Sequence, residues 1–283
     1  MKLDRNMKVL LSPFLIIAIL FSLPLACAFA EEPETNLDVM YEEGQRLLAS
    51  SDSQDIAKGI ALMLTSANAG SAKAMIQVGM MYTNGLGRLL SDDFEDGQEA
   101  QRALSWYEKA AENGEKEAAA AAIANDAFSY FLGSEDGPVK EDDVVALNYF
   151  MRAADLGDPR AINMMVAFYT YGFGVEQDPQ KALELGSSLA DKGDQEALYA
   201  MEENAYAYFS GNKDGIDINF NTAFEYYMKL TEYGNERAMY NVGLLYEYGL
   251  GTSKDHAKAI EWVTKAQDAG YEPAKAMLEE LSK

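Results

Sequence analysis

Apolar positions along most of this chain recur with the spacing of amphipathic helices. Ala259, Trp262, Val263 and Ala266 fall on one side of a helix, and polar residues separate them. Steps of three and four residues are typical of an α-helix with one buried face. Gly270 then follows where such a helix would end in a left-handed residue. The pattern predicts helices joined by short turns.

The same phrase occurs six times along the chain. The copies read KGIALMLTSANAG, RALSWYEKAAENG, VALNYFMRAADLG, KALELGSSLADKG, TAFEYYMKLTEYG and KAIEWVTKAQDAG. They end at Gly70, Gly114, Gly157, Gly193, Gly234 and Gly270, and the fourth residue after each glycine is an alanine, namely Ala74, Ala118, Ala161, Ala197, Ala238 and Ala274. The glycines are 44, 43, 36, 41 and 36 residues apart. This spacing predicts a repeated unit of 36 residues with insertions.

Each unit contains a second apolar-periodic run, which follows the glycine of the preceding phrase, so we expect two helices per unit. We call the helix of this run the first helix of the unit and the helix of the repeated phrase the second helix. One such run extends from Ala238 to Tyr246 and is followed by Gly249 and Gly251, which suit a turn with positive φ angles. Ala238 and Gly243 would let two helices cross closely. We expect the chain to open with helices over about residues 37–49 and 54–69 and to close with a lone helix over 273–282.

Two of the units depart from the regular length. After Gly114 and after Gly193, the aromatic residues that end the first helix come four and three residues late, which predicts one extra helical turn in each. The loops over residues 88–101, 134–144 and 212–221 are also longer than their equivalents. Long loops of a repeat protein usually gather on one face, and that face is often functional.

The repeated phrase, together with A-x-x-x-V-G-x-x-Y-x-x-G-x-G at residues 74–87 and 238–251, resembles the Sel1-like repeat family, which is related to the tetratricopeptide repeats. The resemblance implies an all-α fold, a right-handed α-solenoid of antiparallel helix pairs, in proteins that serve as adaptors. We expect an N-terminal linker and capping helix over 31–57, the solenoid over 58–270 and a C-terminal capping helix over 271–283. Exported bacterial members include host-interaction factors, envelope scaffolds and immunity proteins.

The N-terminus has the pattern of a signal peptide. Basic residues precede an apolar run over residues 9–25, and small residues, Ala28 and Ala30, follow it. We expect residues 1–30 to be a cleavable signal with cleavage after Ala30, which predicts a periplasmic or secreted protein. An uncleaved membrane anchor and a lipoprotein acylated at Cys27 are the alternatives.

The charge balance narrows the class of partner. Without residues 1–30, the chain carries 20 basic and 45 acidic residues and a net charge of −25. Such a charge repels nucleic acids and anionic membranes and attracts basic partners, so we expect a protein partner with basic character, no nucleic acid and no membrane insertion after signal cleavage. The single cysteine, Cys27, lies in the predicted signal, so the processed chain has no disulfide or thiol chemistry.

The residue types that most catalytic and metal sites need are scarce. His256 is the one histidine, and its position beside Asp255 is typical of a surface residue. We therefore predict no catalytic residue, no metal site and no cofactor. Ser210 to Lys213 has the S-x-x-K spacing of penicillin-interacting enzymes, but it falls in a repeat turn and is best explained by chance. The acidic segments 92–97 and 212–217 depart from the EF-hand pattern, so turn-forming loops are favoured, with calcium binding as the alternative.

Candidate partner-binding residues follow from the resemblance to tetratricopeptide grooves. In those proteins the concave wall is made by first-helix residues at fixed offsets from the small residue of the helix. Counting from Gly243 and from Val166, these offsets select tyrosine and arginine residues of the kind enriched in interface hot spots. Scattered surface aromatics are the alternative. The candidates are Arg160, Asn163, Thr170, Tyr171, Arg237, Tyr240, Leu244, Glu247 and Tyr248.

These observations favour an exported protein–protein interaction module that binds a partner through the concave face of the repeats. An immunity protein that neutralises a toxic secreted effector and a structural envelope scaffold are alternatives. A hydrolase acting on cell-wall material is a third, because carboxylate pairs are frequent in so acidic a chain, although their spacing nominates none of them. We expect no enzymatic activity.

Overall fold

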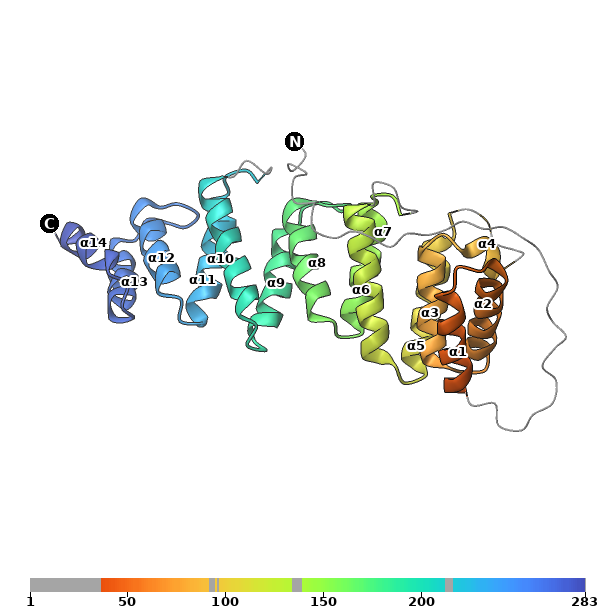
Figure 1. The fold of residues 1–283 in the computed structure, drawn as a ribbon. Coiled ribbons are helices and arrows are strands. Elements are labelled where there is room, and N and C mark those ends of the chain that lie inside the picture. The colour runs from red at the N-terminus through yellow and green to blue at the C-terminus, as the bar shows by residue number, and fades with distance from the viewer. Residues whose placement is uncertain (1–36, 92–94, 96, 134–138, 212–215, 283) are drawn as a thin grey trace. The chain divides into compact units, whose positions relative to one another are not determined.

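The computed structural model describes residues 37–91, 95, 97–133, 139–211 and 216–282, and every regular element in these segments is a helix (Figure 1). The predicted all-α class is confirmed. The fold divides into two compact units, an N-terminal unit that ends at Ala161 and a C-terminal unit that begins at Ile162. The predicted signal peptide, its cleavage site after Ala30 and the lipidation alternative at Cys27 lie outside the described residues.

Apart from the short α4, which lies against α2 and α3, successive helices of the N-terminal unit pack on one another in chain order, and α3 also contacts α6. The first two helices lie where the sequence predicted them. The helices are α1 (Leu37–Leu48), α2 (Ser53–Asn68), α3 (Ala72–Thr83), the short α4 (Gly87–Leu90), α5 (Glu99–Glu112), α6 (Lys116–Leu132) and α7 (Asp143–Asp155).

The C-terminal unit repeats this arrangement and ends in the lone helix that the sequence predicted. Its helices are α8 (Pro159–Tyr171), whose first turn belongs to the N-terminal unit, α9 (Pro179–Ala190), α10 (Gln195–Ser210), α11 (Phe220–Glu232), α12 (Glu236–Tyr248), α13 (His256–Asp268) and α14 (Pro273–Leu281). Helices α6 and α10 have 17 and 16 residues, whereas α3, α8 and α12 have 12 or 13. The predicted extra turn is confirmed in both long helices.

Local sequence explains where the helices begin and end. Side-chain oxygens of a preceding Asp, Asn or Ser accept backbone N–H groups of the first turn in eight helices, and such caps stabilise a helix start by about 1 kcal/mol. The six glycines that close the repeated phrase all have φ between 76° and 107°, which confirms the predicted left-handed ends. The capping residues are Asp52, Ser71, Asp142, Asp178, Asp194, Asn219, Asn235 and Asp255.

The recurring alanine is a buried packing position in every repeat but one. Five of the six alanines are buried, but Ala118 is exposed, and the neighbouring Ala119 is buried in its place. In this repeat the buried alanine therefore comes one residue later than in the others. Residues 118–122 are all alanine, so a pattern of small residues could not decide which of them faces the core.

Small residues allow the two helices of a unit to cross closely, as predicted for Gly243. A Cβ atom at Gly243 would collide with the Val263 side chain of α13. Gly79 has the same role on α3, because a Cβ atom there would lie 2.5 Å from Cε1 of Tyr107 on α5. These contacts set the distance between the first and the second helix.

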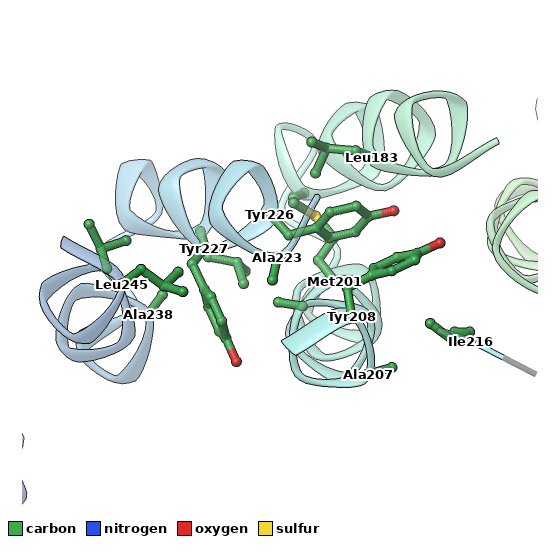
Figure 2. Packing of buried hydrophobic residues seen from close by; sticks show 14 residues of the cluster. Leu183, Met201, Ala207, Tyr208, Ile216, Ala223, Tyr226, Tyr227, Ala238 and Leu245 are labelled. Atoms are coloured by element: carbon green, nitrogen blue, oxygen red, sulfur yellow. The ribbon is translucent and has the colours of Figure 1, made fainter. Parts of the chain in front are cut away.

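The core of the C-terminal unit is rich in tyrosine (Figure 2). The rings of Tyr208 and Tyr226 lie with their centroids 5.8 Å apart, and Leu230 and Leu245 complete the apolar packing. The Tyr227 ring lies between the labelled residues of α10 and those of α12, with its hydroxyl directed away from the other labelled side chains (Figure 2). No helix among the described residues is long and apolar enough to cross a membrane.

Candidate protein-binding face

Exposed aromatic side chains gather on the first helices of the C-terminal unit. Tyr199 and Tyr206 on α10 are 70% and 51% exposed, and Tyr248 on α12 is 66% exposed. The other large hydrophobic residues with comparable exposure in the described chain are aliphatic. Tyrosine is enriched at protein interfaces because it offers a large apolar surface with a polar end.

On α10, two of these tyrosines alternate with acidic residues along one exposed stripe. Glu196, Tyr199, Glu203 and Tyr206 follow each other at intervals of three, four and three residues, and all four are exposed. This interval places them on one side of the helix. The opposite side is buried in the core, with Met201 among its residues. We call these four residues the α10 stripe.

A polar contact joins α10 to the start of α12 beside this stripe. Glu202 accepts hydrogen bonds from the Arg237 guanidinium at 3.0 Å and from the Asn235 side-chain amide at 3.1 Å. Asn235 is also the N-cap of α12, where its oxygen accepts the backbone N–H of Ala238 at 2.7 Å. Glu202 therefore holds the first turn of α12 against α10. Together with Tyr227, the α10 stripe and these α12 contacts form what we call the α10–α12 face.

Tyr227 of α11 contributes a hydroxyl group to this face. The residue is 1% exposed, and burial raises the pKa of its phenol. The positive charge of Arg237 lowers this pKa, while Glu202, Tyr206 and Glu203 raise it further. No hydrogen bond to this hydroxyl is found within the described part of the chain.

The candidate residues on α12 have different environments. Arg237 is half exposed and paired with Glu202, and Tyr248 is exposed. Tyr240 packs against Tyr271 with ring centroids 5.2 Å apart, and this burial raises the pKa of its phenol. Leu244 packs, partly buried, on the cluster formed by α13 and α14. Arg237 and Tyr248 are thus the α12 candidates with the most surface to offer a partner.

Glu247 is held by groups of its own chain. Its carboxylate lies 2.7 Å from Nδ1 of His256 and 3.1 Å from Nζ of Lys254. The hydrogen bonds with His256 and Lys254 keep the pKa of Glu247 below its usual value. These contacts fix the turn after α12, so Glu247 and the single histidine have a structural role.

The candidates near α8 have different environments. Thr170 is fully buried, and its hydroxyl accepts a hydrogen bond from the Asn204 amide at 3.1 Å, so the prediction that it lines a binding wall is corrected. Asn204 of α10 covers it, which the offsets did not foresee. Tyr171 is partly buried and stacks on Phe173, Asn163 is partly buried, and Arg160 belongs to the N-terminal unit, where it pairs with Asp158.

The sequence reasoning missed the α10 stripe. Tyr199 follows Ala197 by two residues, as Tyr240 follows Ala238, so the same count from the recurring alanine would have selected it. Tyr206 lies in the part of α10 that the extra turn displaces. The offsets were applied only from Gly243 and Val166, the small residues in the middle of α12 and α8. They were not applied to the irregular repeat that contains α10.

Metal ligation finds no support in the described segments. They contain no group of three or more His, Cys, Asp or Glu side chains placed to hold a metal ion. Part of each acidic segment considered for calcium, residues 92–97 and 212–217, lies outside the described residues.

Comparison with known proteins identifies the repeat. A family model for the Sel1 repeat matches residues 39–71, 72–115, 119–158, 161–194, 197–230 and 236–271. The first match includes α1, which the sequence analysis assigned to a cap. The match that begins at 119 agrees with the buried Ala119.

Curated relatives match part of the chain. Chitin synthase regulatory factor 4 of Schizosaccharomyces pombe is 33% identical over 144 residues, which is 50% of this chain and 22% of that protein. DAP3-binding cell death enhancer 1 of Rattus norvegicus is 30% identical over 109 residues, 38% of this chain and 18% of that protein. The chain thus spans about a fifth of the length of these two relatives.

Among solved structures, a protective antigen of uropathogenic Escherichia coli that displays an SLR fold is 24% identical, with a TM-score of 0.37. The match covers 86% of this chain and 48% of that chain.

Proposed function

This chain belongs to the Sel1 repeat family, and we propose that it is a protein-binding adaptor that holds a partner on the α10–α12 face of its C-terminal unit. One observation carries this proposal. The three mostly exposed tyrosines of the described chain, Tyr199, Tyr206 and Tyr248, all lie on the first helices α10 and α12. Exposed aromatic residues on one side of a rigid scaffold are typical of interfaces.

The names of the relatives support the adaptor part of the proposal. One is named as a regulatory factor of an enzyme, chitin synthase, and the other for binding the protein DAP3. Both names describe an action on a second protein. Since the chain spans about a fifth of these relatives, the support concerns the repeats alone.

We further propose that the protein acts outside the cytoplasm. The support is the sequence of residues 1–30, with its basic start, its apolar run and the small residues before Glu31. N-terminal sequencing of the protein purified from its native cell tests this part. A mature chain beginning at Glu31 is expected, and an intact Met1 or a lipid-modified Cys27 would contradict cleavage after Ala30.

The binding face is tested by a double substitution with a matched control. Tyr199→Ala with Tyr206→Ala removes the two aromatic rings of the α10 stripe. Val144→Ala with Met151→Ala removes two exposed side chains from α7, which are also seven residues apart. Wild-type and both variant proteins are immobilised, and the proteins captured from native cell extract are quantified by mass spectrometry.

A partner captured by the wild-type and control proteins and reduced about tenfold or more with the tyrosine variant is expected, because two hot-spot tyrosines together contribute roughly 2 kcal/mol or more. Equal capture by all three proteins would overturn the proposed face. Circular dichroism of each variant checks that the helices are intact.

A further inference from the structure

The α10 stripe presents carboxylates that other parts of the described chain do not neutralise. Glu196 and Glu203 are exposed, and no ion pair to either is found in the segments that the structure describes. Glu202, between them in sequence, is paired with Arg237. Two unneutralised negative charges therefore remain on this stripe, in a chain whose overall charge is already negative.

The spacing of the stripe places a carboxylate between two aromatic rings. Tyr199 and Tyr206 are seven residues apart, or about 10 Å along the helix, and Glu203 lies between them on the same side. A cation that pairs with such a carboxylate can also lie over the face of a neighbouring ring, which adds roughly 0.5–1 kcal/mol at an exposed site.

The protein uses this combination within its own fold. Nζ of Lys265 lies 2.7 Å from the Glu261 carboxylate and 4.0 Å from the centroid of the Trp262 ring. All three residues are on α13. A carboxylate and an aromatic side chain on one helix can thus hold the same cation.

Tyr227 of α11 is 1% exposed and packs in the same core cluster as Met201 and Ala205 of α10. Burial raises the pKa of its phenol, and the negative charges of Glu202 and Glu203 raise it further. The positive charge of Arg237 lowers this pKa, but Arg237 is paired with Glu202 and does not neutralise Glu203.

We propose that the α10 stripe binds an arginine or lysine side chain of a protein partner, with its positive charge on Glu203 and its alkyl part against Tyr199 and Tyr206. This rests on the proposed function, since it specifies what the α10–α12 face recognises. The partner is therefore a polypeptide that exposes a basic residue, and charge complementarity selects it over an acidic or purely apolar segment.

The test uses peptides whose only difference is the charge of one side chain. A glycine–serine peptide with one central arginine is titrated into the isotope-labelled protein, and amide chemical shifts are followed by NMR. The same peptide with citrulline, which keeps the shape of arginine without its charge, is the ligand control. Glu203→Gln is the test variant, and Glu225→Gln, an exposed residue of α11, is its matched control.

The arginine peptide is expected to shift the amides of residues 199–206 and of Tyr227 in a saturable way. Replacing arginine by citrulline, or Glu203 by glutamine, is expected to weaken this binding about fivefold, whereas Glu225→Gln leaves it unchanged. Equal binding of both peptides, or equal binding to both variants, would overturn the inference.

The peptide-binding result and the capture experiment can fail independently of each other. If capture of the native partner depends on Tyr199 and Tyr206 while the arginine peptide does not bind the stripe, the adaptor proposal stands and the basic-residue inference is wrong. If capture does not depend on these tyrosines, the proposed face itself is wrong, whatever the peptide does.

Discussion

The two long helices, α6 in the N-terminal unit and α10 in the C-terminal unit, each pack a polar side chain against the threonine of an earlier first helix, but the side chains differ in charge. Asp126 of α6 accepts hydrogen bonds from Thr83 at 2.5 Å and from Tyr107 at 2.7 Å on the same carboxylate oxygen. Asn204 of α10 donates to Thr170 at 3.1 Å. Both residues occupy the same place in their helices, six residues before the last one.

The tyrosines around these two contacts are arranged alike. Tyr149 of α7 donates to the backbone carbonyl of Ala100 at 2.7 Å, and Tyr226 of α11 donates to that of Pro179 at 2.9 Å. Each of these rings also packs against a tyrosine of the long helix, at centroid distances of 5.3 and 5.8 Å. One architecture therefore accommodates a carboxylate in one unit and an amide in the other.

The difference matters because only the carboxylate titrates. Burial raises the pKa of Asp126 from 3.8 to about 6, although the hydrogen bonds from Thr83 and Tyr107 oppose this shift. The folded state thus holds the proton more tightly than the unfolded state does. The resulting stabilisation is fully present below pH 3.8 and is lost as the pH rises through about 6. Asn204 adds no such dependence to the C-terminal unit.

The largest effect is expected from placing the carboxylate in the C-terminal unit. Asn204→Asp buries a charge that has Thr170 as its hydrogen-bonding neighbour, so we expect a loss of roughly 3 kcal/mol of unfolding free energy at neutral pH, recovered near pH 4. Urea unfolding of a Trp106→Phe background measures this, because Trp262 then reports the C-terminal unit. A loss that does not vary with pH would show that the carboxylate is not the cause.

The reverse substitution is expected to remove the pH dependence of the N-terminal unit. In a Trp262→Phe background, fluorescence of Trp106 follows this unit. From about pH 4 to pH 7, the wild-type unit should lose roughly 2 kcal/mol relative to the Asp126→Asn variant, because the amide does not ionise. All other carboxylates are shared by the two proteins, so their contribution cancels. Parallel stability curves would contradict a raised pKa at Asp126.

The tyrosine hydroxyls allow a finer comparison. Tyr107→Phe removes a bond to a charged group, so we expect a loss of roughly 2 kcal/mol at neutral pH, where Asp126 is ionised. Tyr149→Phe and Tyr226→Phe each remove a bond to a backbone carbonyl and should cost about 1 kcal/mol. Thermal unfolding of the three variants measures the order. Equal losses for all three would mean that the Asp126 bond is no stronger than a neutral one.

The smallest effect on stability is expected at the α10 stripe. Tyr199→Ala and Tyr206→Ala should each change the unfolding free energy by less than about 0.5 kcal/mol, since both side chains are mostly exposed. Urea unfolding followed through Trp262 checks this. A loss of 2 kcal/mol or more would mean that these rings stabilise the unit, and their exposure would need another explanation.

Much of this fold could be predicted from the sequence because its signals are local. Apolar residues three or four positions apart, such as Trp262 and Ala266, define the core-facing side of a helix, and glycines such as Gly270 mark helix ends. Because the phrase repeats, the helices assigned in one repeat supported the assignment of the same helices in the next. The late aromatic residues after Gly114 and Gly193 correctly indicated the extra turns.

The candidate site was predicted less well because it depends on how helices cover one another. Thr170 has the right offset for a surface position, yet Asn204 covers it from the next repeat. Glu247 is suitable for binding by residue type, but the folded turn brings His256 and Lys254 to its carboxylate. Neither contact can be read from spacing within one helix. Tyr199 was accessible to the same counting, and the irregular length of α10 obscured it.

The central claim, that the α10–α12 face contacts a protein partner, is tested most directly by photo-crosslinking in the native cell. A photoreactive phenylalanine analogue is placed at Tyr199, at Tyr206 and, as the control, at the exposed Val144 of α7. Adducts with one protein from positions 199 and 206, absent from 144 and abolished by excess unlabelled wild-type protein, are the predicted result. No adduct from 199 and 206, or the same adducts from all three positions, would contradict the account.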